Sequence, residues 1–191
     1  RYKTIAMICP MAATSVTPNR RGARSRDVVL DAAARLMARD GFEAATVAAI
    51  VKESGIPASS VYHYFGSKDG VLLAVMERGA ARFFDELPEP RRRVGTPEEH
   101  LRAVTDGMVH ALGQHPDFLR LLIVFAAQPP DASDGQVREV VNGVRATALE
   151  RLRDQLVLAF GDEPGDPHIL LLSRFALAAI DGAFIAHQSD P

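Results

Sequence analysis

The chain has 191 residues and a formal net charge of −2, and it contains no tryptophan. A chain of this length can bury a substantial core, either as one body or as a small domain joined to a larger one. Cys9 is the single cysteine, which excludes an internal disulfide, argues against a cysteine-built metal site and suits a reducing, cytoplasmic compartment.

Charge is distributed unevenly along the chain. Residues 1–70 hold 10 Lys and Arg against 6 Asp and Glu, a net +4, and the remainder holds 12 against 18, a net −6, which together give −2. An imbalance of this size also arises by chance. A positive N-terminal part nevertheless has the sign that a polyanionic partner requires.

The first segment, residues 1–22, carries few structural signals and is predicted to be a disordered or tag-like arm. Its apolar run, residues 5–11, is short for a secretory signal and is interrupted by Pro10, and Met11 is an alternative start. No run in the chain approaches the length needed to cross a bilayer. The arginines that end the segment belong either to a solvated tail or to an arm that touches DNA. They are Arg20, Arg21, Arg24 and Arg26.

Ala and Leu dominate the chain, and no run of strand length alternates between apolar and polar residues. We therefore predict an all-α fold of eight to nine helices. The first helix is expected over residues 24–40, where an apolar stripe runs up to a terminating Gly41.

Residues 46–65, TVAAIVKESGIPASSVYHYF, have the pattern of two short helices joined by a tight turn. Thr46 suits the N-cap of the first helix, and Pro57 suits the first position of the second. Val61 and Phe65 lie on the inner face of the second helix. Its outer face carries small, hydroxylic and aromatic groups, which is typical of a helix that lies against DNA. These outer residues are Ala58, Ser59, Ser60, Tyr62 and His63.

Further helices are predicted by their start signals and apolar stripes. Ser67 can cap a fourth helix that ends near Leu87-Pro88, and Thr96-Pro97-Glu98-Glu99 is a strong start for a helix that reaches Gly113. Three more helices are predicted over residues 117–127, 134–160 and 168–187. The last is apolar nearly all round, so a second subunit is expected to cover one side. Within it, Arg174 and Asp181 stand two turns apart on the same side. They either pair across the subunit interface, face the pocket or form an ordinary satisfied core polar pair, and we expect the last.

Residues 28–75, VVLDAAARLMARDGFEAATVAAIVKESGIPASSVYHYFGSKDGVLLAV, resemble the N-terminal domain of TetR-family transcriptional regulators. The features that match are the helix ending in Gly41-Phe42, Thr46 with Ile50, Gly55-Ile56, residues 61–65 and Lys68. The resemblance implies a DNA-binding domain over residues 23–67, with the helix-turn-helix motif at 46–65, and a ligand-binding and dimerisation domain of helical-bundle type over residues 68–191.

The resemblance also implies roles for individual residues. The DNA contacts are expected from Thr46, Ala58, Ser59, Ser60, Tyr62, His63 and Lys68, whereas Tyr64 and Phe65 are expected in the core. Thr46 and Lys68 would meet phosphates, and the others would meet phosphates and base edges. No Lys or Arg lies between Ala58 and Phe65, so this helix cannot read guanine with a bidentate arginine.

The resemblance also implies three binding partners. They are a near-palindromic double-stranded DNA operator, a second copy of the chain as a homodimer, and an unidentified small-molecule effector that the few inward polar groups suggest is largely apolar. The candidate pocket residues are Phe83, Phe84, Thr105, Met108, Phe118, Leu122 and Phe125, and ordinary core packing is the competing interpretation for each. The candidate dimer-interface residues are Leu171, Phe175, Ile180 and Phe184.

Signals for catalysis are weak. The six histidines show no metal-ligand spacing, and neither a phosphate-binding glycine motif nor a nucleophile elbow occurs. We therefore expect no enzyme activity, no metal and no cofactor. The sequence favours a homodimeric repressor that a small effector releases from its operator. The alternatives are a helical protein-interaction module without specific DNA binding and a TetR-like activator.

Overall fold

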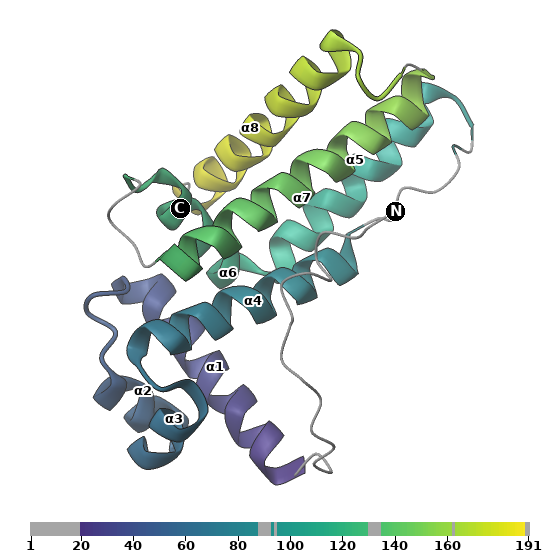
Figure 1. The fold of residues 1–191 in the computed structure, drawn as a ribbon. Coiled ribbons are helices and arrows are strands. Elements are labelled where there is room, and N and C mark those ends of the chain that lie inside the picture. The colour runs from purple at the N-terminus through teal and green to yellow at the C-terminus, as the bar shows by residue number, and fades with distance from the viewer. Residues whose placement is uncertain (1–19, 88–92, 94, 130–134, 162, 190–191) are drawn as a thin grey trace. The chain divides into compact units, whose positions relative to one another are not determined.

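The computed structural model describes residues 20–87, 93, 95–129, 135–161 and 163–189. These residues form eight α-helices (Figure 1), which confirms the prediction of an all-α fold with eight to nine helices. Within these ranges there is no β-strand. Some predictions fall on residues outside these ranges. They concern residues 5–11 with Cys9, the helix end near Pro88, and the start of the predicted helix at residue 134.

The first four helices are α1 (Arg20–Asp40), α2 (Val47–Ser54), α3 (Ala58–Phe65) and α4 (Lys68–Glu86). Helix α1 begins four residues before its predicted start. Arg and Ala are good helix formers, and the last proline before the helix is Pro18, so the helix extends back toward it.

Local caps fix the boundaries of α2 and α3. The Thr46 hydroxyl accepts a hydrogen bond from the Ala49 N–H at 3.1 Å, and Gly55 ends α2 in the left-handed region at φ 67°. Pro57 lies one position earlier than predicted, because it is the N-cap of α3 with an extended ψ of 145° rather than its first helical residue.

The remaining helices are α5 (Pro97–Gln114), α6 (Pro116–Ala127), α7 (Gly135–Phe160) and α8 (Pro167–Ser189). A complete capping box starts α5. The Glu99 N–H donates to the Thr96 hydroxyl at 3.2 Å, and the Thr96 N–H donates to the Glu99 carboxylate at 2.8 Å. The predicted helix start is therefore confirmed.

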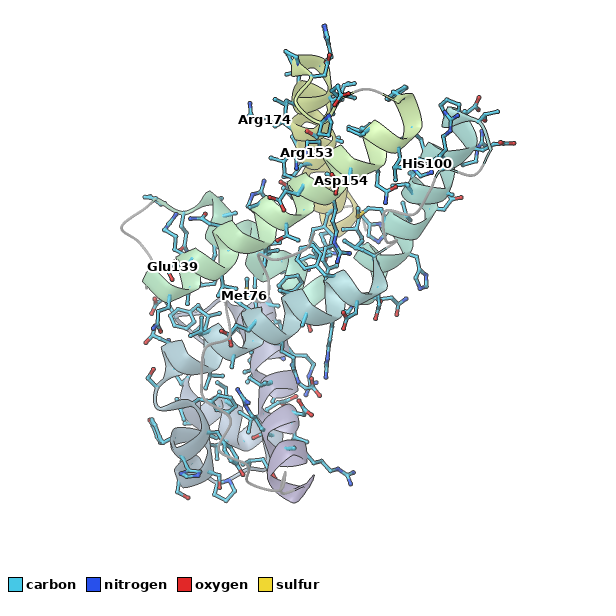
Figure 2. The ribbon with its side chains drawn as sticks, turned by 45° about the vertical axis from the view of Figure 1, so that its right-hand side comes forward. Met76, His100, Glu139, Arg153, Asp154 and Arg174 are labelled. Carbon is cyan, nitrogen blue, oxygen red and sulfur yellow. The ribbon has the colours of Figure 1, made fainter. Side chains whose placement is uncertain are left out.

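The helices form two compact units. The first comprises the described residues of 1–82 and 116–142, and the second comprises those of 83–115 and 143–189. In the first unit α1 packs on α2, α3 and α6. The largest side chains with almost no exposure in this unit include Met37, Ile50, Leu72 and Met76, and Met76 is labelled in Figure 2. The predicted division at residues 67/68 stays a prediction.

Helices α4 and α6 approach closely within the first unit. A Cβ atom added at Gly79 of α4 would overlap the side chain of Phe118 of α6. The added atom would lie 2.7 Å from the Cγ atom of Phe118 and 3.1 Å from its Cβ atom. Phe118 is 5% exposed. The aromatic ring therefore fills the space that the glycine leaves open.

In the second unit, long side chains hydrogen-bond to backbone carbonyls of other segments. Arg151 of α7 donates to the Phe84 carbonyl at 2.9 Å and stacks over the Phe84 ring, and Arg93 donates to the Ala159 carbonyl at 3.0 Å. The predicted polar pair within α8 is wrong. Asp181 pairs with Arg145 of α7 at 2.8 Å, and Arg174 is exposed on α8 (Figure 2).

Helix α8 presents an apolar surface that its own chain leaves open. Leu171 and Phe175 are 66% and 71% exposed, and Leu172 and Ile185 are 43% and 50% exposed. By length and composition alone α8 could cross a membrane, contrary to the prediction that no run approaches this length. One such helix is weak evidence for a membrane span, because core helices of soluble proteins pass the same test.

Candidate nucleic-acid interface

Helix α3 presents one outward face that no other group covers within the part of the chain that the structure describes. Val61, 1% exposed, anchors the helix to the core. Ala58, Ser59, Tyr62 and His63 are exposed, Tyr62 by 52%, and Ser60 is half-buried. Because residues three and four positions apart share a side of a helix, the pairs 58/62, 59/62 and 59/63 join the four exposed groups into one continuous surface. Hydroxyl, phenol and imidazole groups on it can donate to and accept from phosphates and base edges.

Tyr64 and Phe65 turn away from this face. Both are half-buried, their rings meet edge-on at 6.1 Å, and the Arg26 guanidinium lies 5.5 Å from the Phe65 centroid. Such a cation–ring contact fixes the end of α3 against α1. These two aromatic residues position the helix, as expected from their place in the sequence.

Thr46 lies at the exposed N-terminus of α2. Its hydroxyl oxygen accepts from the Ala49 N–H, and its own O–H hydrogen is left to donate to a phosphate. The first N–H groups of a helix attract anions because they lack partners within the helix. The N-cap role and the predicted phosphate contact are therefore compatible.

Lys68 has a second role that the sequence did not reveal. Its Nζ donates to the carbonyls of Phe42 at 3.0 Å and Glu43 at 3.3 Å, and it lies 4.1 Å from the Phe42 ring centroid. The side chain is only 24% exposed. An ammonium group has three N–H donors, so one remains for a phosphate. Lys68 thus ties the start of α4 to the turn that precedes α2.

The turn between α3 and α4 adds groups that the sequence analysis missed as contacts. Ser67 caps α4 by accepting from the Gly70 N–H at 3.0 Å, and its hydroxyl hydrogen stays available. Gly70 is required there, because a Cβ atom would overlap the Phe65 carbonyl oxygen. Lys52 of α2 is an exposed cation that the sequence analysis did not consider, whereas Arg24 of α1, also exposed, is one of the arginines considered above for an arm that touches DNA. The sequence signal that could have identified Ser67 and Lys52 is their position near helix termini.

The predicted pocket residues divide between the two units. Phe118, Leu122 and Phe125 are buried side chains of α6 in the first unit, and Phe83 and Phe84 are buried in the second. Met108 of α5 is half-buried. Thr105 is exposed, contrary to its predicted inward position, and its hydroxyl donates back to the Leu101 carbonyl at 2.8 Å.

The predicted dimer-interface residues also differ in exposure. Leu171 and Phe175 are exposed, Ile180 is half-buried, and Phe184 is buried at 6% within its own chain. Leu172 and Ile185 are exposed apolar residues of α8 that the prediction left out. Among the residues that the structure describes, no group of three or more His, Cys, Asp or Glu could hold a metal ion.

The fold has a helix-turn-helix arrangement in α2 and α3, preceded by α1 and followed by five further helices. Residues 29–75 match the family model described as bacterial regulatory proteins of the tetR family. The HTH-type transcriptional regulator BetI of Brucella canis is 25% identical over 162 residues, which cover 85% of this chain and 79% of the relative. The chain is therefore similar to TetR-family transcriptional regulators.

Solved structures show the same fold. A putative fatty acid metabolism regulator from Clostridium perfringens superposes with a TM-score of 0.69 at 17% identity, covering 85% of this chain and 86% of that one. The complex of SmeT with triclosan gives a TM-score of 0.66 at 23% identity, covering 88% and 82%. At these identities the likeness concerns the fold alone.

Proposed function

We propose that the protein is a homodimeric repressor that binds a near-palindromic operator through α3 and leaves it when a small, largely apolar effector binds. The observation that carries the DNA-binding part is the exposed face of α3, where Tyr62 and His63 lie with no partner surface over them beside the capped start of α2. A helix-turn-helix dimer places two such helices about 34–36 Å apart, which matches successive major-groove faces.

The contacts divide by task. Thr46, Lys68 and the N-terminus of α4 would hold phosphates and set the register on the duplex. Ser59, Ser60, Tyr62 and His63 would meet base edges, and the Ala58 methyl group would touch a thymine methyl. Since this face of α3 carries no Arg or Lys, much of the sequence preference would come from hydroxyl, ring and methyl contacts.

A dimer through α8 is supported by the pattern of its exposed face. Leu171, Phe175, Ala178, Gly182 and Ile185 are all exposed and follow each other at spacings of four, three, four and three residues. That is the repeat with which two helices pack side by side along a continuous seam. An open position at Gly182, where nothing lies within 4 Å, would let a partner helix approach closely.

Support for an apolar effector is less direct. One of the two structural relatives is a complex with triclosan, and the other is a putative fatty acid metabolism regulator. Within the first unit, the candidate pocket residues of α6 are aromatic or aliphatic: Phe118, Leu122 and Phe125. An effector that binds the DNA-free form more tightly would weaken DNA binding, and DNA would weaken effector binding by the same factor.

The test is DNA binding by the full chain to an operator obtained by in-vitro selection, followed by fluorescence anisotropy across a series of salt concentrations. We expect affinity to fall steeply as salt rises, because phosphate contacts release counterions. Tyr62→Ala should weaken operator binding about tenfold or more, as expected for loss of one good base or phosphate contact. Phe160→Ala is the matched control, since Phe160 is 49% exposed on α7 and outside the interface.

Two outcomes would contradict the proposal. If neither the selected duplex nor an unrelated one binds at low salt, the helix-turn-helix is architectural and the chain is a protein-interaction module. If Tyr62→Ala and Phe160→Ala bind the operator equally well, α3 does not read it. A reporter gene behind the native promoter, with the operator at its native position, separates a repressor from an activator, because only operator placement distinguishes them.

A further inference from the structure

A partly open hollow of about 580 Å³ lies within the first compact unit. The end of α1, the turn between α1 and α2, the start of α4, helix α6 and the first turn of α7 form its walls. This volume is in the range of sites that hold small organic molecules. Of the candidate effector-pocket residues, Phe125 alone lines it.

Its walls are largely apolar and aromatic. The rings of Phe42 and Phe125 meet edge-on at 6.1 Å with an interplanar angle of 69°. Leu72 and Leu121 are buried behind them, whereas Val124 is 50% exposed at the rim. A half-exposed valine beside two aromatic rings offers a surface on which a flat apolar group gains contact area by binding.

The polar groups that line the hollow are mostly acceptors. The acceptors are the side chains of Asp40, Glu43, Asp69 and Gln128. The one cationic side chain among the lining residues is Arg120, which donates to the Ala38 carbonyl at 3.4 Å. The side-chain amide oxygen of Gln128, Oε1, is fully buried and has no hydrogen-bond partner among the described residues. Burying an acceptor without a partner costs roughly 1–3 kcal/mol, so a donor that reaches Gln128 is favoured.

The three carboxylates differ in availability. Arg39 binds Asp40 through two hydrogen bonds of 2.7 and 2.8 Å, which lowers the pKa of that carboxyl. The Glu43 carboxylate is 94% exposed and lies 3.8 Å from Lys68 Nζ. Asp69 is exposed and has no ion pair within the described part of the chain. Asp69 is therefore the carboxylate most available to a ligand.

We propose that this hollow binds a small organic cation with an aromatic body. The ring would lie against Phe42, Val124 and Phe125, and a protonated amine would donate to Gln128 and Asp69. Phe42 connects the site to DNA binding, because its carbonyl accepts from Lys68 and its turn leads directly to the N-cap of α2. An occupant that displaces the Phe42 ring would move the start of the helix-turn-helix motif.

Three indole probes that differ in charge test the proposal on the full chain without DNA. They are tryptamine (a cation), 3-methylindole (neutral) and indole-3-acetate (an anion). Since the chain has no tryptophan, indole fluorescence reports the probe alone. We expect tryptamine to bind about tenfold more tightly than 3-methylindole, a difference of about 1.4 kcal/mol, and indole-3-acetate to bind most weakly. Equal affinities for the three probes, or tightest binding of the anion, would overturn the proposal.

Variants locate the binding. Val124→Arg places bulk and positive charge at the rim and should weaken tryptamine binding at least tenfold. Val109→Arg is the matched control, because Val109 is 64% exposed on α5 in the other unit. If both variants lose tryptamine equally, or neither does, the probe binds elsewhere and the proposal fails.

A second substitution tests the amine contact without adding bulk. Asp69→Asn removes one charge from an exposed position, so the fold should persist, as circular dichroism would show. In this variant, the ratio of the dissociation constant of 3-methylindole to that of tryptamine should fall to less than half of its wild-type value. An unchanged ratio would place the amine away from Asp69 and contradict the assignment. Because no DNA is present, these results stand apart from the success or failure of the proposed repressor function.

Discussion

Replacing Lys68 by Met would keep the aliphatic stem of the side chain and remove its charge and donors. The lysine makes two hydrogen bonds, of 3.0 and 3.3 Å, to the carbonyls of Phe42 and Glu43, and lies over the Phe42 ring. Hydrogen bonds to charged groups contribute about 1.5–3 kcal/mol each when shielded, and a cation–ring contact about 0.5–1 kcal/mol. Since the side chain is 24% exposed, we expect Lys68→Met to lower the free energy of unfolding by about 2–4 kcal/mol.

Urea unfolding followed by circular dichroism, at one fixed protein concentration, measures this loss. The control is Lys52→Met, because Lys52 is exposed on α2 and should change stability by less than about 0.5 kcal/mol. Anisotropy measurements with operator DNA would show whether Lys68→Met also lowers the salt slope by about 0.9, the value for one phosphate contact. A variant with wild-type stability and weaker DNA binding would show that Lys68 acts on phosphate alone, and it would refute the structural role.

Three further substitutions test other parts of the structure. Gly79→Ala should destabilise the protein by up to about 2 kcal/mol in urea unfolding, because overpacking against Phe118 outweighs the better helix propensity of alanine. The double variant with Phe118→Leu should lose less free energy of unfolding than the sum of the losses in the two single variants. Additive losses would contradict the close approach of Gly79 to the Phe118 ring. Thr46→Val should lower the free energy of unfolding by about 1 kcal/mol and weaken DNA binding, because it removes the capping hydroxyl. Thr46→Ser keeps the hydroxyl and should change neither quantity. If the two variants behave alike, the hydroxyl contributes neither to stability nor to DNA binding. Phe175→Glu should shift the protein from dimer to monomer in analytical ultracentrifugation, while Val109→Glu should leave it dimeric. An unchanged dimer in Phe175→Glu would rule out the exposed face of α8 as the interface.

The sequence by itself determined the class of fold and the outline of the exposed face of α3. Both follow from interactions between residues close in the chain. Thr46 caps α2 through an N–H three residues ahead, and Thr96 and Glu99 cap α5 in the same way. The spacing of Val61 relative to Tyr62 and His63 decides which of them point outward from α3.

The tertiary structure alone decided which distant groups meet. Lys68 donates to carbonyls 25 and 26 residues away, although a phosphate contact was the only role that the sequence predicted. Asp181 pairs with Arg145 on α7, 36 residues away, and not with Arg174 on its own helix. Helical periodicity specifies which residues share a face, but the partner of that face depends on how the helices pack, which no local pattern records.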